Sequence, residues 1–168
     1  MAYTIEQFSK DVHDALTEDP GPAGREIARQ YLARACTDAD FVAKHLGPDN
    51  DIDRTILYED PELKFCILAH VYKGPKASQP HDHGPAWAIY GQVKGVTEMT
   101  DWECIEKPKD GNPGKVRKIK SYEMKPGDAY VYNEGVLHSP RRESETRLIR
   151  MEGVNMQGVK RDKYEVAA

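Results

Sequence analysis

The sequence predicts a mainly β fold, a barrel or sandwich of short strands, with a helical segment at its N-terminus. After about residue 50, short apolar runs alternate with turn clusters such as Gly74-Pro75 and Pro126-Gly127-Asp128, a texture typical of all-β proteins. Before that point, apolar residues recur at helical spacing, and such segregated helices cannot supply βαβ crossovers. The 168 residues suit one domain. We therefore expect helices in residues 1–50 to pack on a barrel formed by residues 51–168.

Three helices are expected in the first part of the chain. Thr4 can cap the first, with Gln7 at the spacing of a capping box, and Asp19-Pro20-Gly21-Pro22 ends it. The second runs through residues 27–35. The third is capped by Thr37 or Asp38 and stops at Gly47-Pro48.

Seven apolar runs are the expected strands of the barrel. They span residues 55–58, 65–72, 87–93, 96–102, 116–122, 129–132 and 148–151. Glycine-rich and proline-rich turns separate them, and a further extended segment begins at His138.

Composition and charge exclude several classes of function. The 24 Lys and Arg residues against 28 Asp and Glu residues give a net charge of −4, which argues against a general nucleic-acid binder. No apolar run approaches the length of a membrane span, and no secretory signal is visible at the N-terminus. Cys36, Cys66 and Cys104 lack paired spacing, which favours reduced thiols and a cytoplasmic location.

Three of the six histidines form the strongest candidate site. His81 and His83 stand at i and i+2, and in a strand both imidazoles would point to one face. His138 follows Gly135 at the start of an extended segment. Three imidazole ligands leave coordination positions open for substrate or oxygen. An HxH pair alone is a weak signal, but Pro80 and Gly84 bound this one.

The other histidines lack that setting. His13 and His45 lie on expected helices and are expected at the surface. His70 lies in an apolar strand, where a hydrogen-bonded core histidine is expected rather than a fourth ligand.

The spacing around the three histidines resembles the two motifs of the cupin family. The first motif, G-x5-H-x-H-x3-4-E-x6-G, is matched with one extra residue by Gly74, His81, His83, Ala88 and Gly95. The second, G-x5-P-x-G-x2-H-x3-N, is matched by Gly127, Asn133, Gly135, His138 and Arg142. The resemblance covers about residues 52–156. It implies a jelly-roll barrel, the cupin double-stranded β-helix, with a metal held by His81, His83 and His138.

One replacement in the first motif makes the resemblance more specific. Ala88 stands where most cupins have a Glu ligand. A three-histidine set with a small residue at that position resembles the cysteine dioxygenase branch of cupins, the thiol dioxygenases. That resemblance implies a non-haem Fe(II) centre, although Ni, Zn or Mn could occupy it in a purified sample. It also places Arg54 near the position of the family's carboxylate-binding Arg, with a one-residue gap.

The resemblance fails at the Ser-His-Tyr relay of the thiol dioxygenases. The corresponding stretch here is residues 148–152, where Arg150 stands near the His position and no Tyr is present. We therefore expect Arg54 and Arg150 to bind a substrate carboxylate. Trp87, Tyr90 and Tyr132 are candidates to line the substrate pocket, although aromatic residues in barrel strands more often serve packing.

The sequence thus predicts an iron dioxygenase, an oxidoreductase acting on a small anionic, thiol-carboxylate-like substrate with oxygen. Two alternatives stay open: a three-His cupin dioxygenase that cleaves a C–C bond of a diketone-like substrate, and a non-enzymatic cupin that binds a metal or small molecule. Analogy with other cupins suggests a homodimer.

Overall fold

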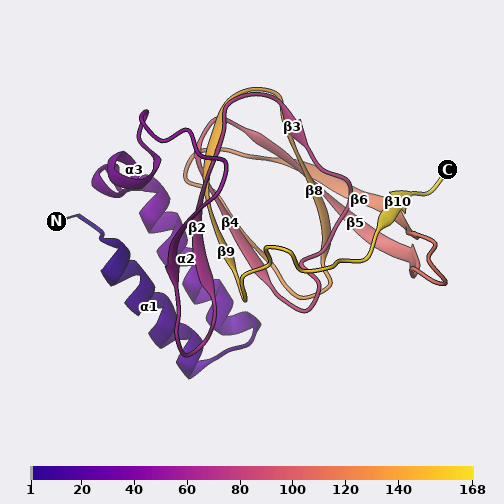
Figure 1. Cartoon of the computed structure of the whole chain (residues 1–168), viewed down its shortest axis with the longest axis horizontal. Helices are drawn as coiled ribbons and strands as arrows, with labels where there is room; N and C mark the ends of the chain where they lie inside the picture. The colour runs from indigo at the N-terminus through magenta and orange to yellow at the C-terminus, as the bar shows by residue number, and fades with distance from the viewer. Residues whose placement is uncertain (1) are drawn as a thin grey trace.

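The computed structural model describes residues 2–168 and is mainly β, with two five-stranded sheets that curl around a common interior (Figure 1). The first sheet has the order β1 (Thr55–Glu59), β2 (Cys66–Tyr72), β9 (Thr146–Glu152), β4 (Ala88–Lys94) and β7 (Ala129–Tyr132). The second has the order β10 (Tyr164–Val166), β6 (Gly114–Met124), β5 (Thr97–Glu106), β8 (Leu137–Arg142) and β3 (Lys76–Ala77). Because sequence neighbours repeatedly fall in different sheets, the strands wind as a double-stranded β-helix. The expected fold class is confirmed.

Three N-terminal helices cover the outer face of the first sheet, shown in indigo and purple in Figure 1. They are α1 (Ile5–Glu18), α2 (Pro22–Thr37) and α3 (Ala39–Leu46). The Thr4 side chain caps α1 by accepting the Gln7 N–H at 3.1 Å, whereas the Gln7 side chain donates to Asp11 and does not close a capping box. Asp38, and not Thr37, caps α3. No helix among residues 2–168 is both long and apolar enough to cross a bilayer.

Helix α2 packs closely against the first sheet at Gly91 of β4, which has no side chain. A Cβ atom at Gly91 would lie 2.5 Å from Cys36 Sγ and 3.0 Å from Leu32 Cδ2. Both of those residues belong to α2, so glycine at this position lets the helix approach the strand. A larger residue would push α2 away from the sheet.

The seven expected strands correspond to β1, β2, β4, β5, β6, β7 and β9. The prediction lacks the short edge strands β3 and β10, because two or three residues are too few for an apolar alternation to be recognised. The extended segment expected at His138 is β8, which begins at Leu137 and pairs with both β5 and β3.

The first sheet separates two interiors, which explains why its central strands are buried on both faces. In β2, every second residue (Ile67, Ala69 and Val71) packs in the helix-side core, and in β9 Ile149 and Met151 do the same. The alternate residues point toward the second sheet. That inner face carries His70 and Tyr72 of β2 and Arg150 and Glu152 of β9. These polar side chains of the first sheet therefore lie between the two sheets.

Candidate metal centre

The three predicted histidines come together inside the barrel, where one loop meets strand β8. His81 and His138 form a single antiparallel bridge, with His81 N–H 3.0 Å from His138 O and His138 N–H 2.9 Å from His81 O. Gly135 has φ +77°, which a residue with a side chain rarely adopts, in the turn leading to β8. The expectation of a regular strand for the HxH pair was wrong: His81 and His83 lie in the loop between β3 and β4. The bridge places His81 opposite His138, and the loop that follows His81 carries His83.

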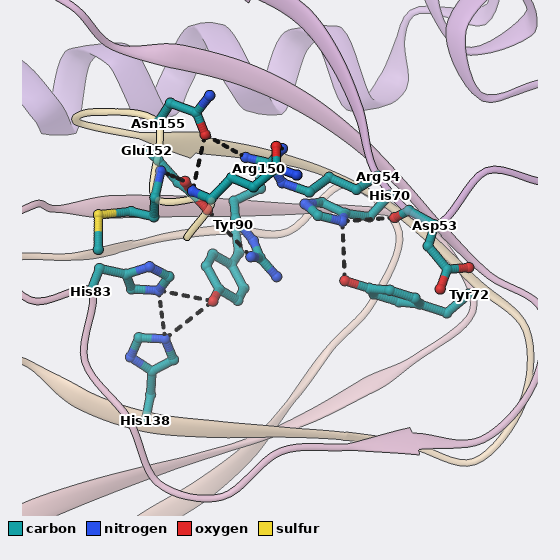
Figure 2. Close-up of polar contacts among 12 residues, drawn as sticks. Asp53, Arg54, His70, Tyr72, His83, Tyr90, His138, Arg150, Glu152 and Asn155 are labelled. Atoms are coloured by element: carbon teal, nitrogen blue, oxygen red, sulfur yellow. Dashed lines mark hydrogen bonds and ion pairs between the residues drawn. The ribbon is translucent and has the colours of Figure 1, made fainter. Parts of the chain in front are cut away.

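The spacing of the ring nitrogens suits ligands of a single ion. One ligating atom from each histidine lies within 4.8 Å of the other two. The Nε2 atoms of His83 and His138 are 3.1 Å apart (Figure 2). Two nitrogens bound at about 2.0–2.1 Å to one ion, at angles of 90–109°, would be about 2.9–3.4 Å apart. Without a proton or an ion between them, the two lone pairs would repel each other.

The protonation of the histidines also fits a metal site. The Nδ1 atoms of His81 and His138 lie 2.8 Å from Gln79 O and 3.2 Å from Val136 O. A carbonyl only accepts, so each Nδ1 carries the hydrogen and each Nε2 has its lone pair free. Burial lowers the pKa of all three imidazoles, and the neighbouring histidines and Arg150 lower the pKa of His83 further. Neutral imidazoles are the form that binds metals.

The Tyr90 hydroxyl lies between two of these ligands. It is 3.0 Å from His83 Nε2 and 3.2 Å from His138 Nε2 (Figure 2). Tyr90 is buried, and it projects from β4 on the same face as Ala88, with which it shares an inner cluster. A hydroxyl at this position can donate a hydrogen bond to a nitrogen or to a ligand held beside the nitrogens. Ala88 places no carboxylate here.

Tyr132, on the neighbouring strand β7, lies beside Tyr90 on the same face of the first sheet and begins a chain of hydroxyls. Its ring centroid lies 4.3 Å from that of His138. Its hydroxyl is 2.5 Å from that of Tyr122, which donates to Asp101 Oδ1 at 3.0 Å. Burial raises the pKa of Tyr132 and Tyr122 above the ordinary range, so both phenols stay neutral. Tyr132 therefore lies beside His138, and its role in binding substrate stays a prediction.

Trp87 does not lie near the three histidines. It packs in the helix-side core, on the face of the first sheet opposite to Ala88 and Tyr90. The Arg25 guanidinium of α2 lies 5.6 Å from its ring centroid. The prediction overlooked strand alternation, which separates Trp87 from its neighbour Ala88. Its expected role in binding substrate gains no support from this position.

Arg54 and Arg150 are brought together in a pocket of about 270 Å³. Four cationic side chains line it, from Arg54, Lys76, Arg150 and Arg161, against the carboxylates of Asp53 and Glu152. Arg54 donates to Asn155 Oδ1 at 2.9 Å and to Gln157 Oε1 at 3.1 Å (Figure 2). Among residues 2–168 it has no ion pair with the nearby acidic residues that would have explained it as a surface Arg.

Arg150 links this pocket to the histidines. Its guanidinium carbon lies 4.6 Å from the centroid of the Tyr90 ring, whose hydroxyl contacts His83 and His138. Its nearest carboxylate contact is long, 3.4 Å from Nη1 to Glu152 Oε1, and its buried Nε has no hydrogen-bond partner among the described residues. A cation this poorly paired in a buried site favours an incoming anion.

The sequence analysis did not identify Arg142 and Tyr72 as residues of this interior, and it assigned His70 only to the core. Arg142 is buried and lies 4.9 Å over the Tyr72 ring. His70 lines the pocket with Tyr72 and does not belong to the metal group, in line with the expectation that it is not a fourth ligand. The sequence does hold a signal for this. His70 and Tyr72 are two positions apart, which places two polar side chains on one face of an apolar strand.

Comparisons with known proteins find only distant similarity to solved structures. No protein-family model and no curated protein sequence matches the chain. Similar solved structures include a cupin-2 domain containing protein from Shewanella frigidimarina, 13% identical over 70% of this chain and 95% of that one, with a TM-score of 0.46. KdgF from Halomonas sp. is 19% identical over 59% and 74%, with a TM-score of 0.44. An oxalate oxidase is 15% identical over 66% and 55%, with a TM-score of 0.45.

One of these neighbours is a cupin-2 domain containing protein, and another is an enzyme, an oxalate oxidase. At such TM-scores and identities the likeness carries no argument about the metal, substrate or reaction of this chain. The resemblance to the thiol dioxygenase branch stays a prediction from the sequence. What the chain itself shows is a double-stranded β-helix in which His81, His83 and His138 form a group that fits a metal ion.

Proposed function

We propose that this chain is a metal-dependent oxidoreductase that binds one divalent ion, expected to be Fe(II), and acts with oxygen on a small thiol-carboxylate-like substrate. The observation that carries the proposal is an uncharged ligand set, His81, His83 and His138, beside a cation-rich pocket. An ion held by neutral ligands keeps its full positive charge. The ion and the pocket would therefore both favour an anion.

Arg54 and Arg150 would bind the substrate carboxylate. Both guanidinium groups line the pocket, and Arg150 also lies over the Tyr90 ring beside the histidines. A guanidinium binds a carboxylate through two parallel hydrogen bonds, which fixes the orientation of the substrate as well as its position. The carboxylate end would then lie in the pocket and the reactive end toward Tyr90.

The protein would supply a dry, shaped cavity around the reacting atoms. Tyr90 is 1% exposed, Tyr132 3% and His138 0%, so these three side chains are shielded from bulk water. An Fe(II) ion in this site would supply open coordination positions and redox chemistry. The Tyr90 hydroxyl, which contacts two ligand nitrogens, would orient a substrate group by a hydrogen bond.

The test is oxygen consumption by the protein reconstituted with Fe(II) under anaerobic conditions. Small thiol carboxylates, the same thiols without a carboxylate, and β-diketones are each added with air-saturated buffer. We expect uptake only with thiol carboxylates, and none in the His138→Ala variant, which lacks a ligand. Uptake with β-diketones alone would support the C–C-cleaving alternative. No uptake with any substrate, in protein that holds a full complement of iron, would support a non-enzymatic binding role.

A further inference from the structure

A buried hydrogen-bond acceptor faces the cation-rich pocket. His70 stands in the middle of β2, is 2% exposed, and lines the pocket together with Arg54 and Arg150. Its neighbours Ala69 and Val71 point to the helix-side core, so the imidazole points into the barrel. This histidine is not a metal ligand, and the proposed function does not use it.

The contact with a backbone carbonyl determines which nitrogen of His70 carries the hydrogen. Nδ1 lies 2.9 Å from the carbonyl oxygen of Asp53 and 3.1 Å from the Tyr72 hydroxyl (Figure 2). The carbonyl can only accept, so Nδ1 is the donor. Burial, with smaller effects of Arg150, Arg142 and Arg54, lowers the pKa of His70 well below its ordinary value. The ring is therefore neutral, and Nε2 carries an unshared lone pair.

Nε2 has no hydrogen-bond partner among the described residues, although it is buried. Leaving such an acceptor unpaired destabilises the folded protein, so buried polar atoms are normally paired. Unpaired donors lie in the same interior: Arg150 Nε and Arg142 Nη2 are also buried without partners among residues 2–168. Close to the pocket there are therefore unpaired donors that carry positive charge and, at His70 Nε2, an unpaired neutral acceptor.

We propose that His70 is a specificity-determining residue, whose Nε2 accepts a hydrogen bond from a hydroxyl or amino group of the ligand that Arg54 and Arg150 hold by its carboxylate. The ligand class is then a small carboxylate that also bears a hydrogen-bond donor. This inference rests on the anion pocket of the proposed function and narrows what that pocket selects. A site built to pair a donor rejects the analogue that lacks it, because its own acceptor is then left unpaired.

Matched pairs of acids test this by calorimetric binding to the metal-reconstituted protein without oxygen. The pairs are lactate and 3-hydroxypropionate, each compared with propionate, and malate compared with succinate. In the wild-type protein we expect the better hydroxy acid to bind on the order of tenfold or more tightly than its partner. His70→Phe keeps a ring of similar shape without the acceptor, so the ratio should fall close to one while propionate affinity changes little.

Two further variants keep the result interpretable. His70→Gln retains an acceptor oxygen and should recover part of the preference, and His45→Gln, on α3 away from the pocket, should leave it unchanged. Metal content and circular dichroism must match the wild-type protein. Two results would overturn the role of His70 but not the anion pocket. In the first, the preference for the hydroxy acid survives in His70→Phe. In the second, the wild-type protein binds both acids of every pair equally, with an affinity that depends on Arg54. If no acid binds the wild-type protein, this inference falls together with the anion pocket.

Discussion

Ala88 leaves the candidate metal centre without a carboxylate ligand. It is fully buried on the inner face of β4, in one cluster with Tyr90 and Tyr132, whose side chains contact the histidines. A carboxylate placed here would lie beside three neutral imidazoles and cancel part of the charge of a bound ion. The small residue thus keeps the centre attractive to anions.

Restoring the carboxylate with Ala88→Glu should therefore tighten metal binding and weaken the binding of anionic substrates. Metal affinity is measured by competition with a chromophoric chelator, and anion affinity by calorimetry. Ala88→Gln is the matched control, because it adds the same bulk, which costs about 1–3 kcal/mol of stability in a packed core, without the charge. Equal metal affinities for the Glu and Gln variants would show that residue 88 does not face the ion.

Arg54 is the second residue whose substitution has a sharp outcome. Its guanidinium is held by Asn155 and Gln157 in the pocket. Arg54→Ala should raise KM for a carboxylate substrate by about ten- to a hundredfold, since a hydrogen bond to a charged group contributes about 1.5–3 kcal/mol. Arg54→Lys should recover part of this, because an ammonium lacks the planar fork. Metal content should stay unchanged in both variants; an unchanged KM in Arg54→Ala would leave Arg150 as the carboxylate-binding residue.

At the scale of elements, helix α2 supports the loop that leads to His138. Arg25, nearly buried on α2, donates to both carboxylate oxygens of Glu134, with Nη2 2.8 Å from Oε2, and to Asn133 Oδ1 at 3.0 Å. Both partners precede Gly135 in the second motif. The ion pair therefore joins the helical segment to the loop that leads to His138.

Arg25→Ala should lower the free energy of unfolding by about 1–3 kcal/mol, because it breaks a two-pronged contact and leaves polar groups unpaired. The matched control is Arg29→Ala on the same helix, whose exposed pair with Glu26 contributes only about 0–1 kcal/mol. Urea unfolding of the three proteins measures both changes. Equal losses from the two variants would show that the contact with the loop adds nothing to an ordinary surface pair.

The same contact has a defined pH dependence. The hydrogen bond from Arg25 lowers the pKa of Glu134 below its ordinary value. In the unfolded chain this carboxyl takes up its proton at higher pH, so the contribution of the pair is present above the ordinary pKa and is lost as pH falls through the lowered one. The stability difference between wild type and Arg25→Ala should therefore shrink below about pH 4. A difference that stays constant to pH 3 would contradict the ion pair.

At the scale of the whole molecule, the sequence predicted the architecture and the three-histidine group but not the full pocket. The short apolar runs and the spacing of glycines and histidines are local features of the sequence. They therefore predicted most of the strands and the group of three histidines. The pocket depends on which residues face one another across paired strands, as Tyr90 and Arg150 do between β4 and β9. The neutral, unpaired Nε2 of His70 follows from its contact with Asp53, seventeen positions earlier, and no local pattern announces that contact.

A bound ion should stabilise the whole barrel, since the ligands come from the β3–β4 loop and from β8. At a free metal concentration about 100 times Kd, the linkage amounts to about 2.7 kcal/mol, or roughly 5–10 °C in Tm for a chain of this size. Thermal unfolding with and without a chelator measures it. The increase should vanish in His138→Ala, and an equal increase in that variant would place the stabilising ion elsewhere.

The most direct test of the central claim is the metal content of single-histidine variants. Each protein is loaded anaerobically with Fe(II), freed of excess ion and analysed by plasma mass spectrometry. We expect about one ion per chain in the wild type, near-complete loss in the Ala variants of His81, His83 and His138, and about one ion in His70→Ala, because only the first three form the ligand group. Loss of metal in His70→Ala together with full metal in His138→Ala would contradict the account.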